Sequence, residues 1–214
     1  MRNLIDGIQD FSKNVFPNKK KLFQELAEGQ KPHTLLITCS DSRIDPNLIT
    51  QTEPGELFVL RNAGNIVPPY GASKGGEEAS IEFAIEGLGV KNIVVCGHSK
   101  CGAMAALLGK ADTSQLPATK LWLDYAAATK KRMTNTSADE HIRCTEENVL
   151  VQIQNLKTHP AVSLALAKGK IQIFAWVYHF ESGNVHMYQN KIGKYVPVAD
   201  LKTDQDKHPD LFCL

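Results

Sequence analysis

The chain of 214 residues lacks any apolar run that approaches the roughly 20 residues needed to span a bilayer. Its opening residues, 1–11, carry acidic and polar side chains where a secretory signal would have an apolar stretch. It also has little net charge, because 24 basic side chains nearly balance 23 acidic ones and leave a net charge of +1. We therefore expect a cytoplasmic protein without a membrane segment, and neither nucleic acid nor a membrane as its main partner.

Cysteines are few and odd in number: Cys39, Cys96, Cys101, Cys144 and Cys213. An odd set in a chain of this length, in a reducing compartment, argues against a disulfide framework. Metal binding or plain burial explains these thiols better. We expect simple burial for Cys96, Cys144 and Cys213.

Apolar runs of strand length alternate with helical patterns along the chain. The runs that predict strands cover residues 34–39, 57–60, 92–96, 171–178 and 185–188. The helical patterns cover residues 4–16, the stretch KKKLFQELAEG after Pro17, residues 76–88, a stretch from Gly102 and a longer one that includes 147–156. We expect Pro17 to interrupt the first two helices.

This alternation implies right-handed crossovers and a mainly parallel sheet. We predict an α/β fold with about five strands, in the order 2-1-3-4 plus an antiparallel edge strand after a turn at 181–184, flanked by helices. One domain covers 1–214: an N-terminal helical arm at 1–29, a catalytic core at 30–189 and a C-terminal tail at 190–214.

Two short polar segments follow two of the predicted strands. Residues 39–43 read CSDSR and come directly after the first strand, whereas residues 98–102 read HSKCG and come directly after the third. In the order 2-1-3-4, the carboxyl ends of strands 1 and 3 flank the switch point at which α/β sheets bind ligands. We therefore expect the two segments to face each other.

The side chains of these segments suit a zinc ion. Cys39, His98 and Cys101 offer two thiolates and an imidazole, and three protein ligands leave one of four positions open, as in a catalytic site. Asp41 could fill that position itself. Arg43 could instead pair with its carboxylate, which would then accept a hydrogen bond from a zinc-bound water. Such a site would work better as pH rises.

Two other interpretations of the same residues stay open. A closed structural zinc site with Asp41 as fourth ligand is possible, although a structural site does not need Arg43 to hold the carboxylate. A redox pair of Cys39 and Cys101 is less favoured, because the chain has no Cys-x-x-Cys motif.

Five motifs occur in an order that resembles the β-class carbonic anhydrases. They are ITCSDSR at 37–43, PGELFVLRNAGN at 54–65, SIEFAIEGLGVKNIVVCGHSKCGA at 80–103, EENVLVQIQNLKTHPAV at 146–162 and AWVYHFESGNV at 175–185. The resemblance runs from about Gln30 to the strand near Tyr188.

This resemblance implies a lyase that hydrates CO₂ reversibly to bicarbonate and a proton through a zinc-bound hydroxide, with one Zn²⁺ per chain. By position, Cys39, His98 and Cys101 match the zinc ligands, and Asp41 and Arg43 match the dyad that closes on the metal or releases it to water. It further implies a homodimer in which N-terminal helices embrace the partner, or a tetramer or larger homo-oligomer, with the active site near the dimer interface.

Other matching positions bear on the subtype. Gln30 matches a glutamine that hydrogen-bonds substrate in the plant-like subtype, and Phe58 matches an apolar wall residue of the same pocket. Phe83 stands where that subtype commonly has a tyrosine, and Leu36 stands where the bicarbonate-inhibited subtype has a tryptophan. Gln30 and Leu36 favour the open, plant-like subtype, whereas Phe83 departs from its pattern and puts one polar contact in doubt. The backbone N–H of Gly102 could join Gln30 as a donor to the developing oxyanion.

Two alternatives belong to other functional classes. A hydrolase of CS₂ or COS would use a similar fold and metal site. A non-catalytic zinc-stabilised protein would leave Arg43 without a role.

Overall fold

The structure, a computed structural model, describes residues 1–133 and 139–201, except for the side chain of Arg2. Cys213 and the predicted tail beyond residue 201 lie outside the described residues. The chain divides into two compact units, Met1–Lys31 and a larger one that begins at Pro32. Each unit is described by itself.

The N-terminal unit is helical throughout. It contains α1 (Arg2–Asp10), the π-helical turn η1 (Phe11–Val15) and α2 (Phe16–Ala27), and helical backbone angles continue through both junctions. The prediction that Pro17 interrupts the helix is therefore wrong. A proline within a helix lacks an N–H and presses on the carbonyl four residues earlier, and the wider turn η1, which ends two residues before Pro17, accommodates both effects.

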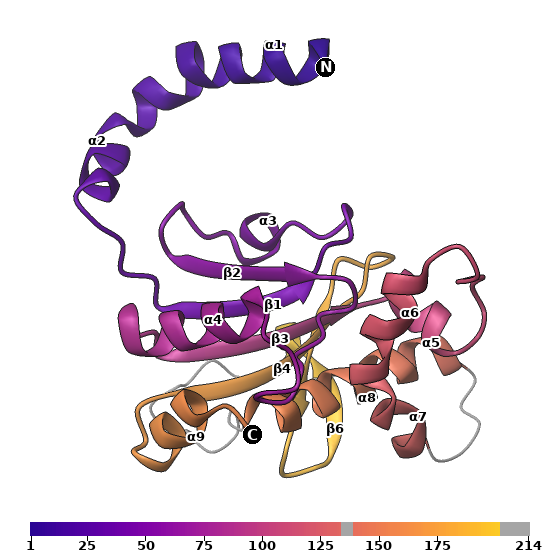
Figure 1. Ribbon diagram of the computed structural model, residues 1–214. Coiled ribbons are helices and arrows are strands. Elements are labelled where there is room, and N and C mark those ends of the chain that lie inside the picture. The colour runs from indigo at the N-terminus through magenta and orange to yellow at the C-terminus, as the bar shows by residue number, and fades with distance from the viewer. Residues whose placement is uncertain (134–138, 202–214) are drawn as a thin grey trace. The chain divides into compact units, whose positions relative to one another are not determined.

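The larger unit is built on a six-stranded sheet (Figure 1). Its strands are β1 (Thr34–Cys39), β2 (Leu57–Asn62), β3 (Asn92–His98), β4 (Gln172–Tyr178), β5 (Val185–Gln189) and β6 (Lys194–Pro197). The order is β2-β1-β3-β4-β5-β6, with β1 to β4 parallel and the last two strands antiparallel. The predicted order 2-1-3-4 with an antiparallel strand after it is confirmed.

The prediction of about five strands is one short. Residues 194–197, which we assigned to the tail, form β6 and pair with β5 from Gln189↔Lys194 to His186↔Pro197. This strand has only four residues at the edge of the sheet and none of them is fully buried. A strand so short and so exposed leaves no alternation of apolar and polar residues in the sequence.

The helices of this unit confirm the predicted helical stretches and add others. They are α3 (Pro46–Thr50), α4 (Gly76–Glu82), η2 (Phe83–Gly87), α5 (Gly102–Leu107), α6 (Pro117–Leu123), η3 (Asp124–Ala126), α7 (Ala128–Arg132), α8 (Glu140–Leu156), α9 (Pro160–Ala167) and η4 (Val198–Asp200). At the start of α8, the Asp139 carboxylate accepts hydrogen bonds from the amides of His141 and Ile142, the usual capping arrangement.

Strand β1 lies inside the sheet and is buried along its whole length. Leu35 and Ile37 pack into a core cluster shared with residues of α4, α8 and α9, whereas Leu36 packs on the opposite face with Ile44 and Val94. Burial on both faces explains why the sequence of β1 is apolar without alternation. It also fixes the carboxyl end of the strand, where Cys39 stands.

Candidate metal centre

The structure brings the three predicted ligands together at the carboxyl ends of the central strands. Cys39 is the last residue of β1, His98 is the last residue of β3, and Cys101 directly precedes α5. One ligand atom from each lies within 4.8 Å of the other two, and all three residues are buried. Among the described residues, this is the one cluster of histidine, cysteine and acidic side chains able to hold a metal ion.

The imidazole of His98 is oriented for a metal. Its Nδ1 lies 2.9 Å from the carbonyl oxygen of Ser99, so Nδ1 carries the proton and donates it there. Its Nε2 is buried and has no hydrogen-bond partner among the described residues. A buried acceptor without a partner is unfavourable, and a metal ion bound beside two thiolates would satisfy it. The donor set fits Zn²⁺.

The two thiols behave as a coupled pair. The pKa of Cys39 is lowered to about 4, first because the Cys101 thiol donates a hydrogen bond to its sulfur. The pKa of Cys101 is raised by the same hydrogen bond and by burial. A dication bound by both sulfurs would replace this hydrogen bond and its proton.

A backbone amide also serves the Cys39 sulfur. The amide of Gly64 donates to Cys39 Sγ at 3.3 Å. Gly64 has φ +82°, and a Cβ at this position would lie 2.9 Å from the Cβ of Ala103. Glycine is thus required for this close approach.

Asp41 lies beside the cluster and is held by Arg43. The guanidinium donates from Nε to Oδ1 at 2.9 Å and from Nη2 to Oδ2 at 2.7 Å, and the amide of Arg43 donates to Oδ1 at 3.0 Å. These contacts, the guanidinium first, lower the pKa of Asp41. Its Oδ2 lies 3.8 Å from Nε2 of His98. The carboxylate therefore reaches the edge of the cluster while it stays paired.

Arg61 fixes the loop that carries Asp41, and the sequence analysis missed it. From β2 its guanidinium donates to the carbonyl oxygens of Cys39 at 3.0 Å, Asp41 at 2.8 Å and Ile44 at 3.0 Å. The available signal was a charged residue near the carboxyl end of an otherwise apolar strand run. These three hydrogen bonds from one guanidinium restrict the conformation of the loop 39–44.

The other predicted site residues do not all reach the cluster within one chain. Phe58 pairs with Leu35 and Asn62 with Cys39, which places Phe58 about 13 Å back along the strands. Its ring lies 6.0 Å from that of Phe83, which is 50% exposed. Gly102 directly follows Cys101, and Gln30 belongs to the N-terminal unit. The roles of Gln30, Phe58, Phe83 and Gly102 stay predictions.

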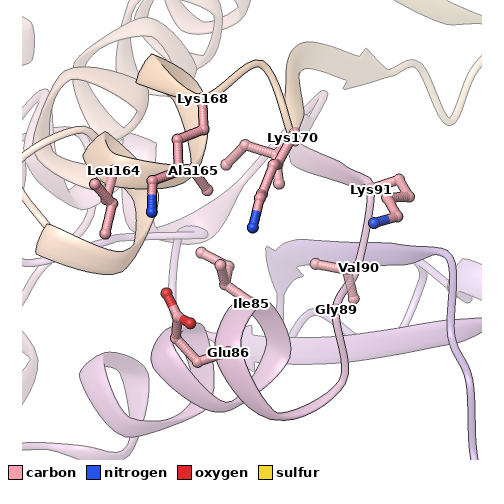
Figure 2. Close-up of a pocket in the computed structure, with 10 residues that line it drawn as sticks. Ile85, Glu86, Gly89, Val90, Lys91, Leu164, Ala165, Lys168 and Lys170 are labelled. Atoms are coloured by element: carbon pink, nitrogen blue, oxygen red, sulfur yellow. The ribbon is translucent and has the colours of Figure 1, made fainter.

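The pockets lined by described residues include two outside the cluster. One, of about 400 Å³, adjoins the metal loop and is lined by Ser99, Lys100, His141 and Glu181, among others. The second, of about 240 Å³, is lined by residues at the amino ends of β3 and β4, with Ile85, Val90, Ala165 and Ile171 among buried residues and Lys91, Lys168 and Lys170 among charged ones. In Figure 2, the side chains of Lys168 and Lys170 point toward the helical turn that carries Glu86, and the carboxylate of Glu86 points back toward them.

Known proteins share this architecture over most of its length. A family model described as carbonic anhydrase matches residues 34–185. A carbonic anhydrase of Synechococcus elongatus is 52% identical over 86% of this chain and 70% of its own length. A carbonic anhydrase of Pseudomonas aeruginosa is 46% identical over 94% of this chain and 93% of its own.

Solved structures agree with the sequence comparisons. The β-carbonic anhydrase CcaA superimposes with a TM-score of 0.88 at 43% identity, over 92% of this chain and 91% of that one. A tetrameric β-carbonic anhydrase from Sordaria macrospora superimposes with a TM-score of 0.78 at 28% identity, over 91% and 98%. Among the described residues, no helix is long and apolar enough to cross a membrane. With this fold, this cluster and these relatives, the chain belongs to the β-class carbonic anhydrases.

Proposed function

We propose that this protein is a carbonic anhydrase, a lyase that hydrates CO₂ reversibly to bicarbonate and a proton, with one zinc ion held by Cys39, His98 and Cys101. The observation that carries the proposal is the buried, unpaired Nε2 of His98 in a cluster with Cys39 and Cys101 whose ligand atoms lie within 4.8 Å of one another. A zinc ion bound there would act as a Lewis acid that lowers the pKa of water from about 15.7 toward 7.

Asp41 has the free acceptor capacity that the reaction needs. Its Oδ1 accepts two hydrogen bonds from Arg43 and its Oδ2 accepts one, so Oδ2 keeps a lone pair at 3.8 Å from His98 Nε2. There it accepts a hydrogen bond from the attacking water and turns a lone pair of that water toward the carbon of CO₂. The amide of Gly102 and the side chain of Gln30 from the other subunit of a dimer donate to the oxygens that become negative.

The same pairing supports the open, plant-like subtype. With both oxygens bonded to Arg43, Asp41 is kept from acting as a fourth ligand. Leu36, which stands where the bicarbonate-inhibited subtype has a tryptophan, is buried among Ile44 and Val94. No polar side chain at this position offers a bicarbonate ion a second binding place.

We propose a homodimer, or a tetramer built from such dimers, as the active form. Phe58 and Phe83 are too far from the cluster of their own chain to line its pocket, and Phe83 is half-exposed. Leu4, Ile5 and Ile8 of α1 are exposed as well, which marks a surface that a partner covers. In such a dimer Gln30, Phe58 and Phe83 line the pocket of the partner's metal centre. An active monomer in analytical ultracentrifugation would contradict this.

No observation favours either of the two competing functions. The curated relatives are named carbonic anhydrases, which does not favour a CS₂ or COS hydrolase. A non-catalytic zinc protein would not need the Asp41–Arg43 pair. A cytoplasmic location is also part of the proposal, since a reducing compartment suits four unpaired buried cysteines among the described residues. Cell fractionation tests it.

Stopped-flow CO₂ hydration tests the activity. The zinc-loaded protein at about pH 8.5, above the neutral pKa of zinc-activated water, is expected to hydrate CO₂ far faster than buffer alone. A chelated sample should lose this activity and regain it when zinc is added back. Full zinc occupancy without activity would refute the proposal.

A further inference from the structure

The turn after β4 packs against residues 98–101, the metal loop, which contains two of the predicted ligands. We propose that Glu181 in this turn is a positioning residue that holds Ser99 and Lys100 in place, so that Arg43 keeps Asp41 turned away from the metal position. This inference rests on the proposed zinc site. Glu181 is neither a predicted ligand nor part of the Asp41–Arg43 pair.

Both carboxylate oxygens of Glu181 are used on consecutive residues of the metal loop. Oε2 accepts a hydrogen bond from the Ser99 hydroxyl at 2.8 Å, and Oε1 lies 3.2 Å from the ammonium of Lys100. Ser99 and Lys100 are the two residues between His98 and Cys101. One side chain therefore fixes the whole connection between two predicted ligands.

The backbone carbonyls of Ser99 and Lys100 each accept a hydrogen bond from a side chain of the site. The carbonyl of Ser99 accepts the proton of His98 Nδ1 at 2.9 Å, which sets the direction of the imidazole. The carbonyl of Lys100 accepts from Arg43 Nη2 at 3.1 Å. Displacement of either carbonyl would change the orientation of His98 or of Arg43.

Lys100 also has a backbone conformation that needs support. Its φ of +53° lies in the left-handed region, which a non-glycine residue occupies at a cost. Its side chain is bonded to Glu181 while its carbonyl is bonded to Arg43. Without Glu181, Lys100 is free to relax, and the carbonyl that Arg43 uses moves with it.

Phe180 strengthens the same contact. Its amide donates to the Ser99 hydroxyl at 3.0 Å, and its ring centroid lies 4.9 Å from that of His98 and 4.7 Å from the guanidinium carbon of Arg43. The dipeptide of Phe180 and Glu181 thus touches the imidazole, the guanidinium and the loop that joins them. This arrangement locks the rotamers of the groups that shape the site.

Because the ion pair between Lys100 and Glu181 is exposed, a positioning role of Glu181 can be distinguished from a role in stability. The side chains of Lys100 and Glu181 are 65% and 46% exposed, and exposed ion pairs contribute little to stability. Replacement of Glu181 should leave the melting temperature nearly unchanged. Its effect should instead appear in how firmly the metal is held and in how the metal is coordinated.

The test compares Glu181→Ala and Glu181→Gln with the wild type. The control is Glu140→Gln at the start of α8, which breaks an ion pair to Lys110 of similar exposure, 51% on each side. For each protein we would measure the rate of zinc release to a chelator, the visible absorption of the Co²⁺-substituted form, and kcat and KM for CO₂ hydration.

Glu181→Ala should release zinc about tenfold faster, the scale typical of residues that orient metal ligands. Its Co²⁺ spectrum should shift as Asp41 enters the fourth position, and kcat should fall while KM stays constant. Glu181→Gln keeps an acceptor for Ser99 and should show a smaller change in the same direction. Glu140→Gln should match the wild type.

Two results would overturn the inference. One is a Glu181→Ala protein whose zinc release and Co²⁺ spectrum equal those of the wild type. The other is a Glu140→Gln protein that loses zinc as fast as Glu181→Ala, since any lost surface charge would then have the same effect. A wild type without CO₂ hydration would refute the proposed function, yet the metal measurements would still decide the role of Glu181.

Discussion

The two ends of the parallel strands carry charged residues in different ways. At the carboxyl ends, Asp41, Arg43 and Glu181 each make several hydrogen bonds or ion pairs whose partners are themselves fixed. At the amino ends, Lys168 and Lys170 line a pocket but form no side-chain hydrogen bond or ion pair with other described residues. Charge and a hollow exist at both ends. At the carboxyl ends the named side chains are held in fixed orientations by their partners, and a metal centre requires such fixed orientations.

Loss of a predicted ligand should have the largest effect. Cys101→Ala removes one of three ligands, so zinc content should fall from about one per chain to background, and CO₂ hydration should fall with it. Elemental analysis of the purified protein measures the first quantity. The lysine pair at the other end serves as comparison, because Lys168→Gln with Lys170→Gln should keep full zinc. A zinc-replete Cys101→Ala protein would contradict the ligand assignment.

Asp41→Asn should have the next largest effect. The amide has one acceptor oxygen in place of two, and its –NH₂ group cannot accept from Arg43, so zinc should stay bound while kcat drops about a hundredfold. Stopped-flow kinetics with parallel zinc analysis gives both numbers. Normal turnover in a zinc-loaded Asp41→Asn protein would show that the paired carboxylate has no part in the reaction.

After zinc removal, the buried thiols should differ in their reactivity with an alkylating reagent. In the chelated protein, Cys39 should react with iodoacetamide once the metal no longer protects it, because its lowered pKa leaves it as a thiolate. Cys96 and Cys144 should stay unreactive, because burial raises the pKa of these thiols to about 12 and about 11. Peptide mass spectrometry locates the label. Equal labelling of all four residues would mean that chelation had unfolded the protein.

The sequence was enough to predict the cluster, because its ligands follow central strands that are apolar throughout. Runs such as 34–39 identify parallel strands, and the switch-point rule then places Cys39 and His98 side by side. The ligand assignment needed no side-chain geometry beyond that. The strand order 2-1-3-4 was a premise of this step, and the sheet has that order.

The supporting contacts could not be predicted in this way. Arg61 and Glu181 act through carbonyls and hydroxyls of a neighbouring loop, and such contacts depend on how two turns meet in space. Strand β6 was missed because its four residues sit at an exposed edge. The continuous helix across Pro17 depended on a π-helical turn, for which the sequence contains no periodic signal.

A smaller effect should appear in how the free energy of unfolding depends on pH. It involves two histidines, one in the turn after β4 and one in β5. The rings of His179 and His186 lie 4.2 Å apart, and burial, first of all, lowers the pKa of each. The folded state then binds fewer protons than the unfolded state below about pH 6.5, so stability falls as pH drops below that value. Urea unfolding at about pH 7.5 and about pH 5.5 measures the loss. His186→Gln should reduce it, and an unchanged difference between the two pH values would exclude the pair as its source.

The smallest effect is expected at the amino ends of the strands. Lys168→Gln combined with Lys170→Gln should change kcat and zinc content by less than about twofold, since solvated side chains without fixed partners contribute little to distant geometry. The melting temperature should also stay close to that of the wild type. A large loss of activity would show that the two ends of the sheet are coupled.

The central claim is that Cys39, His98 and Cys101 hold zinc while Arg43 keeps Asp41 off the fourth position. A crystal structure of the zinc-loaded protein at about pH 8.5, with anomalous data at the zinc edge, tests it most directly. We predict two sulfurs at about 2.3 Å and one nitrogen at about 2.0 Å, a solvent oxygen as the fourth ligand, and Asp41 still paired with Arg43. A zinc ion ligated by the Asp41 carboxylate, with Arg43 turned away, would contradict the account.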